Sequence, residues 1–387
     1  MDHLNKLEGE LRVGLGWSGY RVDRVNVRSL RPLHAIRIME GRPAEQAVKQ
    51  IPMLFSVCGK AQGVAAGLAL EAARDVEPDA IAQREREGGV LAEAMQEHLW
   101  RILLDWPQAL GQNGRPEPLA LLRRQIAQFM PDNIRPADAH ASQDLAVFIN
   151  GFLAEHVFGM KAAEWLELES IGRFEKWLHS SITPTAVLFG ELWNGAGRWG
   201  RSDISQLPEL DRGALLKQIA PELKKNPDFA RCPSWSDAPA ETGALARMRG
   251  NALIQAMLQR EGNTVAARMA ARLVEIAAIA SRLQQLAVSP PAPRSLILAV
   301  HVAAGVGIAR VETARGMLLH FLQLDADRVA RYVIVAPTEW NFHPTGACVE
   351  GLRGLESRDP FELRKKAELL VASLDPCVAW KVDVERI

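Results

Sequence analysis

Alternating polar and apolar positions near the start of the chain predict a β-hairpin. Residues 10–17 alternate, residues 18–20 include Gly19 and favour a turn, and residues 21–27 resume an extended pattern. Such alternation is typical of strands that bury one face. We therefore expect two strands here, joined by a tight turn.

The middle of the chain has the periodicity of helices. Residues 44–51 have a helical pattern that Pro52 is expected to end, and residues 61–73 form a run rich in Ala and Leu that is typical of a closely packed helix. Residues 89–195 are mostly amphipathic. Residues 264–286 carry the longest helical pattern, which predicts a core helix.

The last third of the chain returns to strand patterns after a long irregular connection, which we expect over residues 195–239 because Gly, Pro, Trp and Ser are frequent there. Residues 301–309 and 316–322 are apolar, residues 325–327 indicate a turn, and residues 332–336 read as a buried strand. Since strand patterns lie at both ends of the chain, we expect the two ends to pair.

These elements predict an α+β fold that is mainly helical, with long central helices and strands contributed by both chain ends. One compact unit is expected, in three segments. They are a β-hairpin and ligand loop over 1–60, a helical body over 61–300, and a β-containing segment over 301–387 that completes the site.

Charge and hydropathy exclude several classes of partner. Lys plus Arg and Asp plus Glu both number 46, and no basic block stands out, so neither nucleic acid nor an anionic membrane surface is an expected partner. No apolar run reaches the roughly 20 residues that a membrane span needs. The first residues lack the apolar core of a signal peptide, so we expect a cytoplasmic protein.

Four cysteines are too few for a disulfide framework in 387 residues, so we expect free thiols in a reducing compartment. Cys232 and Cys348 lie in contexts typical of ordinary buried or surface thiols. Cys377 differs because Pro376 precedes it and keeps Asp375 out of the helical region, which places this thiol on a defined turn.

Cys58 lies before the Ala-rich run, at an expected helix N-terminus where the dipole and free N–H groups favour a thiolate. Other chemistry has little support. The nine His residues lack the spacing of a zinc hydrolase, and Gly305 and Gly307 lack the Lys and Ser/Thr of a phosphate loop.

Five stretches resemble motifs of nickel–iron hydrogenase large subunits. Residues 311–320, 332–341 and 373–377 are similar to the consecutive motifs E-A-P-R-G-x-x-x-H, P-T-T-W-N and D-P-C-x-x-C-x-x-H. Upstream, residues 241–247 are similar to E-x-G-P-L-A-R, and residues 41–59 to G-R-x-P followed by R-x-C-G-x-C. The resemblance implies the large-subunit fold.

The chain departs from this family at the metal ligands. The resemblance implies two C-x-x-C pairs that supply four thiolates, but the second positions are Ala61 and Trp380, which leaves Cys58 and Cys377. The terminal His is replaced by Asp383. Two thiolates cannot rebuild a four-sulfur cage for a soft metal, so nickel is an unlikely cofactor.

The residues that are kept are those the family uses around its iron. The resemblance implies that Arg315 and Thr338 donate hydrogen bonds to cyanide ligands of iron, since a guanidinium is a lasting donor to a compact anion. Ala61, Pro337 and Trp380 are expected to line the cavity. The implied ligand is a transient iron carrying cyanide and carbon monoxide.

This combination resembles the HupK/HoxV type of hydrogenase maturation protein. The resemblance implies a non-catalytic scaffold that holds the iron fragment through Cys58 and Cys377, with other maturation proteins and the hydrogenase large subunit as partners. Two alternatives stay open: a divergent hydrogenase with oxidoreductase activity, and a metal-free structural mimic. The missing ligands argue against the first, and the retained Arg315 and Thr338 argue against the second.

Overall fold

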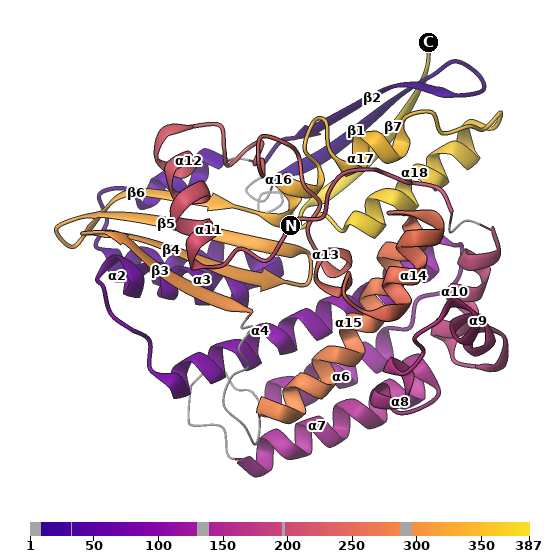
Figure 1. The fold of residues 1–387 in the computed structure, drawn as a ribbon, viewed down its shortest axis with the longest axis horizontal. Helices are drawn as coiled ribbons and strands as arrows, with labels where there is room; N and C mark the ends of the chain where they lie inside the picture. Colours follow the sequence, from indigo (N-terminus) through magenta and orange to yellow (C-terminus); the bar gives the residue numbers. More distant parts are fainter. Residues whose placement is uncertain (1–8, 32, 130–138, 196–197, 287–295) are drawn as a thin grey trace.

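The computed structural model describes residues 9–31, 33–129, 139–195, 198–286 and 296–387. Two small sheets lie beside a body of long helices (Figure 1). Helices dominate, which agrees with the predicted mainly helical α+β class.

The first sheet joins the two ends of the chain. Strands β1 (Glu10–Trp17) and β2 (Val22–Ser29) form the predicted hairpin, and β7 (Ala379–Arg386) pairs parallel with β1 in the order β2-β1-β7. The expectation that the chain ends pair is thus confirmed. The strand that makes the pair, β7, was not predicted.

The second sheet is antiparallel in the order β3-β4-β5-β6. Gly305 has φ +71° in the turn between the first two strands, so it serves a hairpin and no phosphate loop. The strands are β3 (Ile297–Ala303), β4 (Val306–Thr313), β5 (Gly316–Asp325) and β6 (Arg328–Val335).

Helices α2 (Ala44–Leu54) and α3 (Gly59–Ala73) cover one face of the second sheet. The prediction that Pro52 ends the first of them is wrong, because the helix continues to Leu54. Proline removes a single backbone N–H, and in the last turn this loss breaks only one helical bond. Gly63 of α3 lies against the proline ring and leaves room for it.

Gly307 of β4 touches the backbone of α3, since a Cβ there would lie 2.3 Å from the Ala69 carbonyl oxygen. We expect Gly307→Ala to lower the free energy of unfolding by about 2–3 kcal/mol, because helix and strand must separate. Urea denaturation measures this loss. Gly67→Ala is the matched control, since nothing lies within 4 Å of its Cβ position, and it should be neutral or slightly stabilising. An unchanged Gly307→Ala protein would contradict the close approach.

The opposite face of this sheet is covered by a helical segment that the sequence did not predict. Residues 195–239 were expected to be irregular, which is wrong for α11 (Arg212–Ala214), the π-helical turn Leu215–Ile219 and α12 (Ala220–Lys225). Surrounding Gly, Pro and Ser residues mask a short apolar stripe with a helical spacing of four. Its buried members are Leu215, Ile219 and Leu223.

The helical body is centred on α15 (Val265–Leu286), which confirms the predicted core helix. Helix α4 (Ala80–Trp100) packs against it and continues through the π-helical turn Arg101–Asp105 into α5 (Trp106–Ala109). Within the described ranges, no helix combines the length and apolarity that crossing a bilayer requires.

The remaining helices are α6 (Pro116–Phe129), α7 (Ala139–Leu153), the π-helical turn Ala154–Phe158, α8 (Ala162–Leu166), α9 (Ile171–Ser180), α10 (Pro184–Gly195), α13 (Ala244–Met248), α14 (Ala252–Glu261), α16 (Pro337–Asn341), α17 (Ala347–Leu352) and α18 (Pro360–Leu374), with short 3₁₀ helices at Leu33–Met39 and Ser56–Cys58.

Candidate metal centre

A strained turn between α18 and β7 presents Cys377. Asp375, the residue after α18, has φ 56° and ψ 72°, a left-handed conformation that stops the helix. This confirms the prediction that Pro376 keeps Asp375 out of the helical region. Cys377 follows and is buried.

Two side chains hold the sulfur of Cys377. The backbone N–H of Cys377 donates to Thr338 Oγ1 over 3.0 Å, so the Thr338 hydroxyl is free to donate to Cys377 Sγ, 2.9 Å away. Arg31 Nη1 donates to the same sulfur over 3.2 Å. The guanidinium of Arg31 also lies over the ring of Phe55, 5.2 Å from its centroid. This thiol therefore faces one fixed positive charge and one hydroxyl.

Cys58 occupies the N-cap position of α3, at the helix N-terminus as predicted. This position does not stabilise a thiolate in the way that we expected from the sequence. The carboxylate of Glu93 accepts the N–H groups of Lys60 and Ala61 over 2.8 and 2.9 Å, so the helix donors are already taken. Burial, the neighbouring Cys377 and Glu93 together raise the pKa of Cys58 to about 12. The same burial raises the pKa of Glu93 to about 7.

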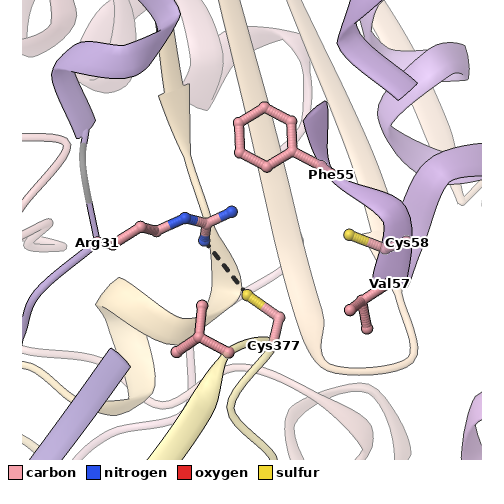
Figure 2. A pocket seen from close by; sticks show the side chains of 6 residues that line it. Arg31, Phe55, Val57, Cys58 and Cys377 are labelled. Atoms are coloured by element: carbon pink, nitrogen blue, oxygen red, sulfur yellow. Dashed lines mark hydrogen bonds between the residues drawn. The ribbon is translucent and has the colours of Figure 1, made fainter. Parts of the chain in front are cut away.

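Both thiols line one small pocket. Figure 2 shows the sulfur atoms of Cys58 and Cys377 facing the same space, although the two residues come from opposite ends of the chain. The empty volume, mouth included, is about 230 Å³. The pocket is lined by Arg31, Phe55, Val57, Cys58, Cys377 and Val378.

The three residues expected to line the cavity are not among those that line this pocket. Ala61 and Pro337 are both buried, the first in α3 and the second at the start of α16. Trp380 is half-buried in β7, where it pairs with Leu11 of β1. Trp380 packs against the main hydrophobic cluster, and Asp383 pairs with Lys381 on the same strand.

Arg315 lies behind the pocket, bound to acidic side chains. Its guanidinium pairs with Glu97 over 2.7 Å and with Asp375 over 3.4 Å. The guanidinium lies near enough to Cys58 to favour the anionic form of that thiol. Its own pKa is raised by Asp375 and Glu97 first, and then by the two cysteines. Of the two predicted cyanide donors, Thr338 thus contacts a thiol directly and Arg315 contributes charge from the second layer.

Sequence reasoning missed Arg31 and Glu93. Arg31 lies in none of the five motif-like stretches, so the sequence carried no signal beyond a single arginine after the predicted hairpin. Burial would lower the pKa of Arg31, but Cys377 and Glu339 outweigh it and hold the pKa above its ordinary value. Glu93 carried no signal, because it reaches the site from the middle of α4 only through tertiary packing.

The other two cysteines lie outside the pocket. Cys348 is buried in α17, and burial raises the pKa of its thiol to about 12. Cys232 is half-buried, and its pKa is raised chiefly by burial. Across the described residues, no three His, Cys, Asp or Glu side chains are grouped to hold a metal ion. The candidate donor set is therefore the sulfur pair of Cys58 and Cys377.

Relatives of known role match nearly the whole chain. The chain is 32% identical over 364 residues to the hydrogenase expression/formation protein HoxV of Cupriavidus necator, with 91% of each chain covered. It is 30% identical to HupK of Rhizobium leguminosarum, covering 93% of this chain and 92% of that one. A sulfhydrogenase 1 alpha subunit from Pyrococcus furiosus is 24% identical over 431 residues, with 100% of this chain and 98% of that subunit covered.

The family model for nickel-dependent hydrogenase matches residues 217–383. In fold, the chain is similar to the nickel–iron–selenium hydrogenase of D. vulgaris Hildenborough, with a TM-score of 0.62, 14% identity, and 92% of this chain and 93% of that chain covered. The corresponding enzyme of Desulfomicrobium baculatum gives a TM-score of 0.60 at 16% identity, with 94% and 95% covered. The chain therefore has the hydrogenase large-subunit fold and belongs to the family of hydrogenase expression/formation proteins represented by HoxV and HupK.

Proposed function

We propose that this protein is a non-catalytic carrier in the maturation of nickel–iron hydrogenases. Its cargo is an iron ion bearing cyanide and carbon monoxide, held through Cys58 and Cys377 before transfer to the hydrogenase large subunit. Other maturation proteins are the expected partners for loading and release. Loading and transfer of the cargo take place in the cytoplasm, where thiols stay reduced.

The observation that carries this proposal is the meeting of two thiols in one pocket beside a guanidinium. Cys58 and Cys377 both line the pocket, and Arg31 donates to one of the sulfurs. Thiolates are soft donors that suit low-spin iron with strong-field ligands. Two sulfur bonds can hold such a fragment, and fewer bonds than in a four-sulfur cage make its release easier.

Charge balance supports an anionic cargo. Iron(II) with two cyanides is neutral, so two thiolates give the bound unit a charge of about −2. Arg31 and Arg315 both lie near Cys58 and Cys377 and lower the cost of placing that charge in a buried site. Thr338 Oγ1 lies 2.9 Å from one sulfur, and we assign Thr338 and Arg315 to the cyanide ligands, with Arg31, which lines the pocket, as a third donor.

The relatives' names support a maturation role over the enzyme alternative. The relatives at 28–32% identity that match nearly the whole chain are expression/formation proteins. The sulfhydrogenase subunit, at 24% identity, supports the enzyme alternative more weakly. At the second position of each C-x-x-C pair this chain has Ala61 and Trp380, so a hydrogenase would lack two of its four sulfurs. A metal-free mimic has no use for two thiols beside a guanidinium.

Infrared spectroscopy tests the proposal. Protein purified without oxygen from cells that contain the maturation machinery should show cyanide and carbonyl stretching bands, with iron near one per chain and no nickel. Cys58→Ser and Cys377→Ser should each remove the bands, and Cys348→Ala, the buried thiol outside the pocket, should keep them. Stoichiometric nickel with hydrogen uptake would favour the enzyme, and folded protein without iron or bands would favour the mimic.

A further inference from the structure

A chain of buried polar side chains leads to the sulfur of Cys58 from behind. Gln62 Nε2 donates to Cys58 Sγ over 3.7 Å, one helical turn along α3. Gln62 Oε1 is 2.9 Å from Nε2 of His320, and Nδ1 of His320 is 2.9 Å from the Tyr332 hydroxyl. Gln62, His320 and Tyr332 are at most 2% exposed. None of them lines the thiol pocket, so they act on it only through Cys58.

The second sheet places these hydrogen-bonded side chains against α3. His320 lies on β5 and Tyr332 on β6, and their rings meet edge to face with centroids 5.6 Å apart. Apolar neighbours of the same sheet face, Leu318 and Leu322, pack against α3 and keep water out. Gln62 reaches this face from the first turn of the helix.

The direction of these hydrogen bonds follows from Tyr332, the last side chain of the hydrogen-bonded series. Within the described ranges, the Tyr332 hydroxyl has no hydrogen-bond partner other than His320, so its proton must go to Nδ1. A neutral imidazole has one donor and one acceptor, which leaves N–H on Nε2 to donate to Gln62 Oε1. Burial and Arg31 lower the pKa of His320 to about 3, so the ring stays neutral. The Gln62 amide must then turn its N–H toward Cys58.

We propose that Gln62 is a positioning residue that directs an amide N–H at the Cys58 sulfur, and that His320 and Tyr332 fix this orientation. The inference deepens the proposed carrier function, because an N–H donated to a ligating sulfur orients that sulfur toward the bound ion and tunes its reactivity. Without the hydrogen bonds of His320 and Tyr332, the Gln62 amide is free to rotate and present its carbonyl oxygen to the sulfur.

The first test reads the imidazole tautomer directly. In protein labelled with ¹⁵N-histidine, the His320 signals, assigned by their loss in His320→Gln, should report a bare Nδ1 and a protonated Nε2. The opposite tautomer would reverse the direction of every bond in the chain and overturn the proposal.

The second test reads Cys58 alone, by the rate of iodoacetamide alkylation of its peptide in the full chain at pH 8. Gln62→Met keeps the length of the side chain but has no N–H, and should slow the reaction about tenfold. Tyr332→Phe should slow it about threefold, because the amide is no longer held. Gln50→Met and Tyr20→Phe are matched controls, bonded to Arg42 and Glu356, and should leave the rate unchanged.

The double variant separates a relay from independent packing effects. If Tyr332 acts through Gln62, adding Tyr332→Phe to Gln62→Met should cause no further slowing. A further threefold slowing, or equal rates in all variants, would overturn the proposal. Thermal melting checks that each variant is folded.

These measurements need no cargo, so they are independent of the proposed function. A responsive thiol in protein that never shows cyanide bands would keep the positioning role of Gln62 and reject the carrier. Cyanide bands in the wild-type protein, with unchanged alkylation in Gln62→Met, would keep the carrier and reject the positioning role.

Discussion

Replacing Asp375 with asparagine should lower the free energy of unfolding by about 3–5 kcal/mol, because it leaves buried cations without their shared anion. The Asp375 carboxylate is 2.8 Å from Arg101, 3.4 Å from Arg315 and 3.5 Å from Arg272. In the part of the chain that the structure describes, it is the only acidic side chain that forms an ion pair with Arg272. The same residue ends α18 and leads into Cys377, so its loss should also disorder the thiol turn.

Acid should remove this stabilisation in the wild-type protein. Burial would raise the pKa of Asp375, but Arg101, Arg315 and Arg272 outweigh it and hold the pKa well below its ordinary value. A carboxylate with a depressed folded-state pKa contributes stability above its unfolded pKa of about 3.9, and that contribution is lost as the pH falls further. The stability of the wild-type protein should therefore fall more steeply below about pH 4 than that of Asp375→Asn.

Urea denaturation at pH 7 and at about pH 2 measures both effects. Asp383→Asn is the matched control, because its carboxylate pairs with Lys381 near the protein surface and such pairs contribute little. The control should lose less than about 1 kcal/mol. Equal stability of Asp375→Asn and the wild-type protein at pH 7 would contradict the role of this carboxylate.

Replacing Arg31 with methionine should lower the retention of the iron cargo about ten- to a hundredfold, given the proposed function. Arg31 donates to Cys377 Sγ over 3.2 Å, and a hydrogen bond from a cation to an anionic acceptor contributes about 1.5–3 kcal/mol. Its charge also favours the anionic form of Cys58. Methionine fills a similar length without charge, so the change removes the guanidinium and little of the packing.

The measurement is the intensity of the cyanide and carbonyl bands, with iron per chain, after gel filtration without oxygen. Arg31→Lys should retain part of the cargo, since an ammonium keeps the charge but lacks the planar set of donors. Arg24→Met, on the exposed side of β2, is the matched control and should bind as the wild-type protein does. Full retention in Arg31→Met would exclude the guanidinium from the site.

Arg31 and Asp375 lie at different depths in one group of charged side chains around the thiols. Arg31 lies at the pocket and faces the sulfurs, while Asp375 lies behind and holds Arg315 in place. Because a guanidinium cannot lose its proton in this setting, the positive charge stays fixed when the cargo leaves. The first substitution should therefore affect mainly binding, and the second mainly folding.

The sequence by itself determined the parts of this protein that depend on neighbours along the chain. The apolar period over 264–286 gave the core helix α15, and alternation gave the hairpin of β1 and β2. The steric effect of Pro376 on Asp375 is equally local, so the turn before Cys377 could be predicted. Motif order was enough to select Cys58 and Cys377 as a pair, and the structure places both in one pocket.

Only the tertiary structure decided what surrounds these thiols. Arg31 reaches Cys377 across 346 positions of sequence, and Glu93 accepts the N–H group of Lys60, beside Cys58, across 33. Trp380 lies outside the pocket lining, on β7, whose pairing with β1 is a long-range contact that local periodicity does not encode. The environment of a buried thiol depends on dehydration and on charges that folding brings together. Neither can be derived from the residues next to the thiol in the sequence.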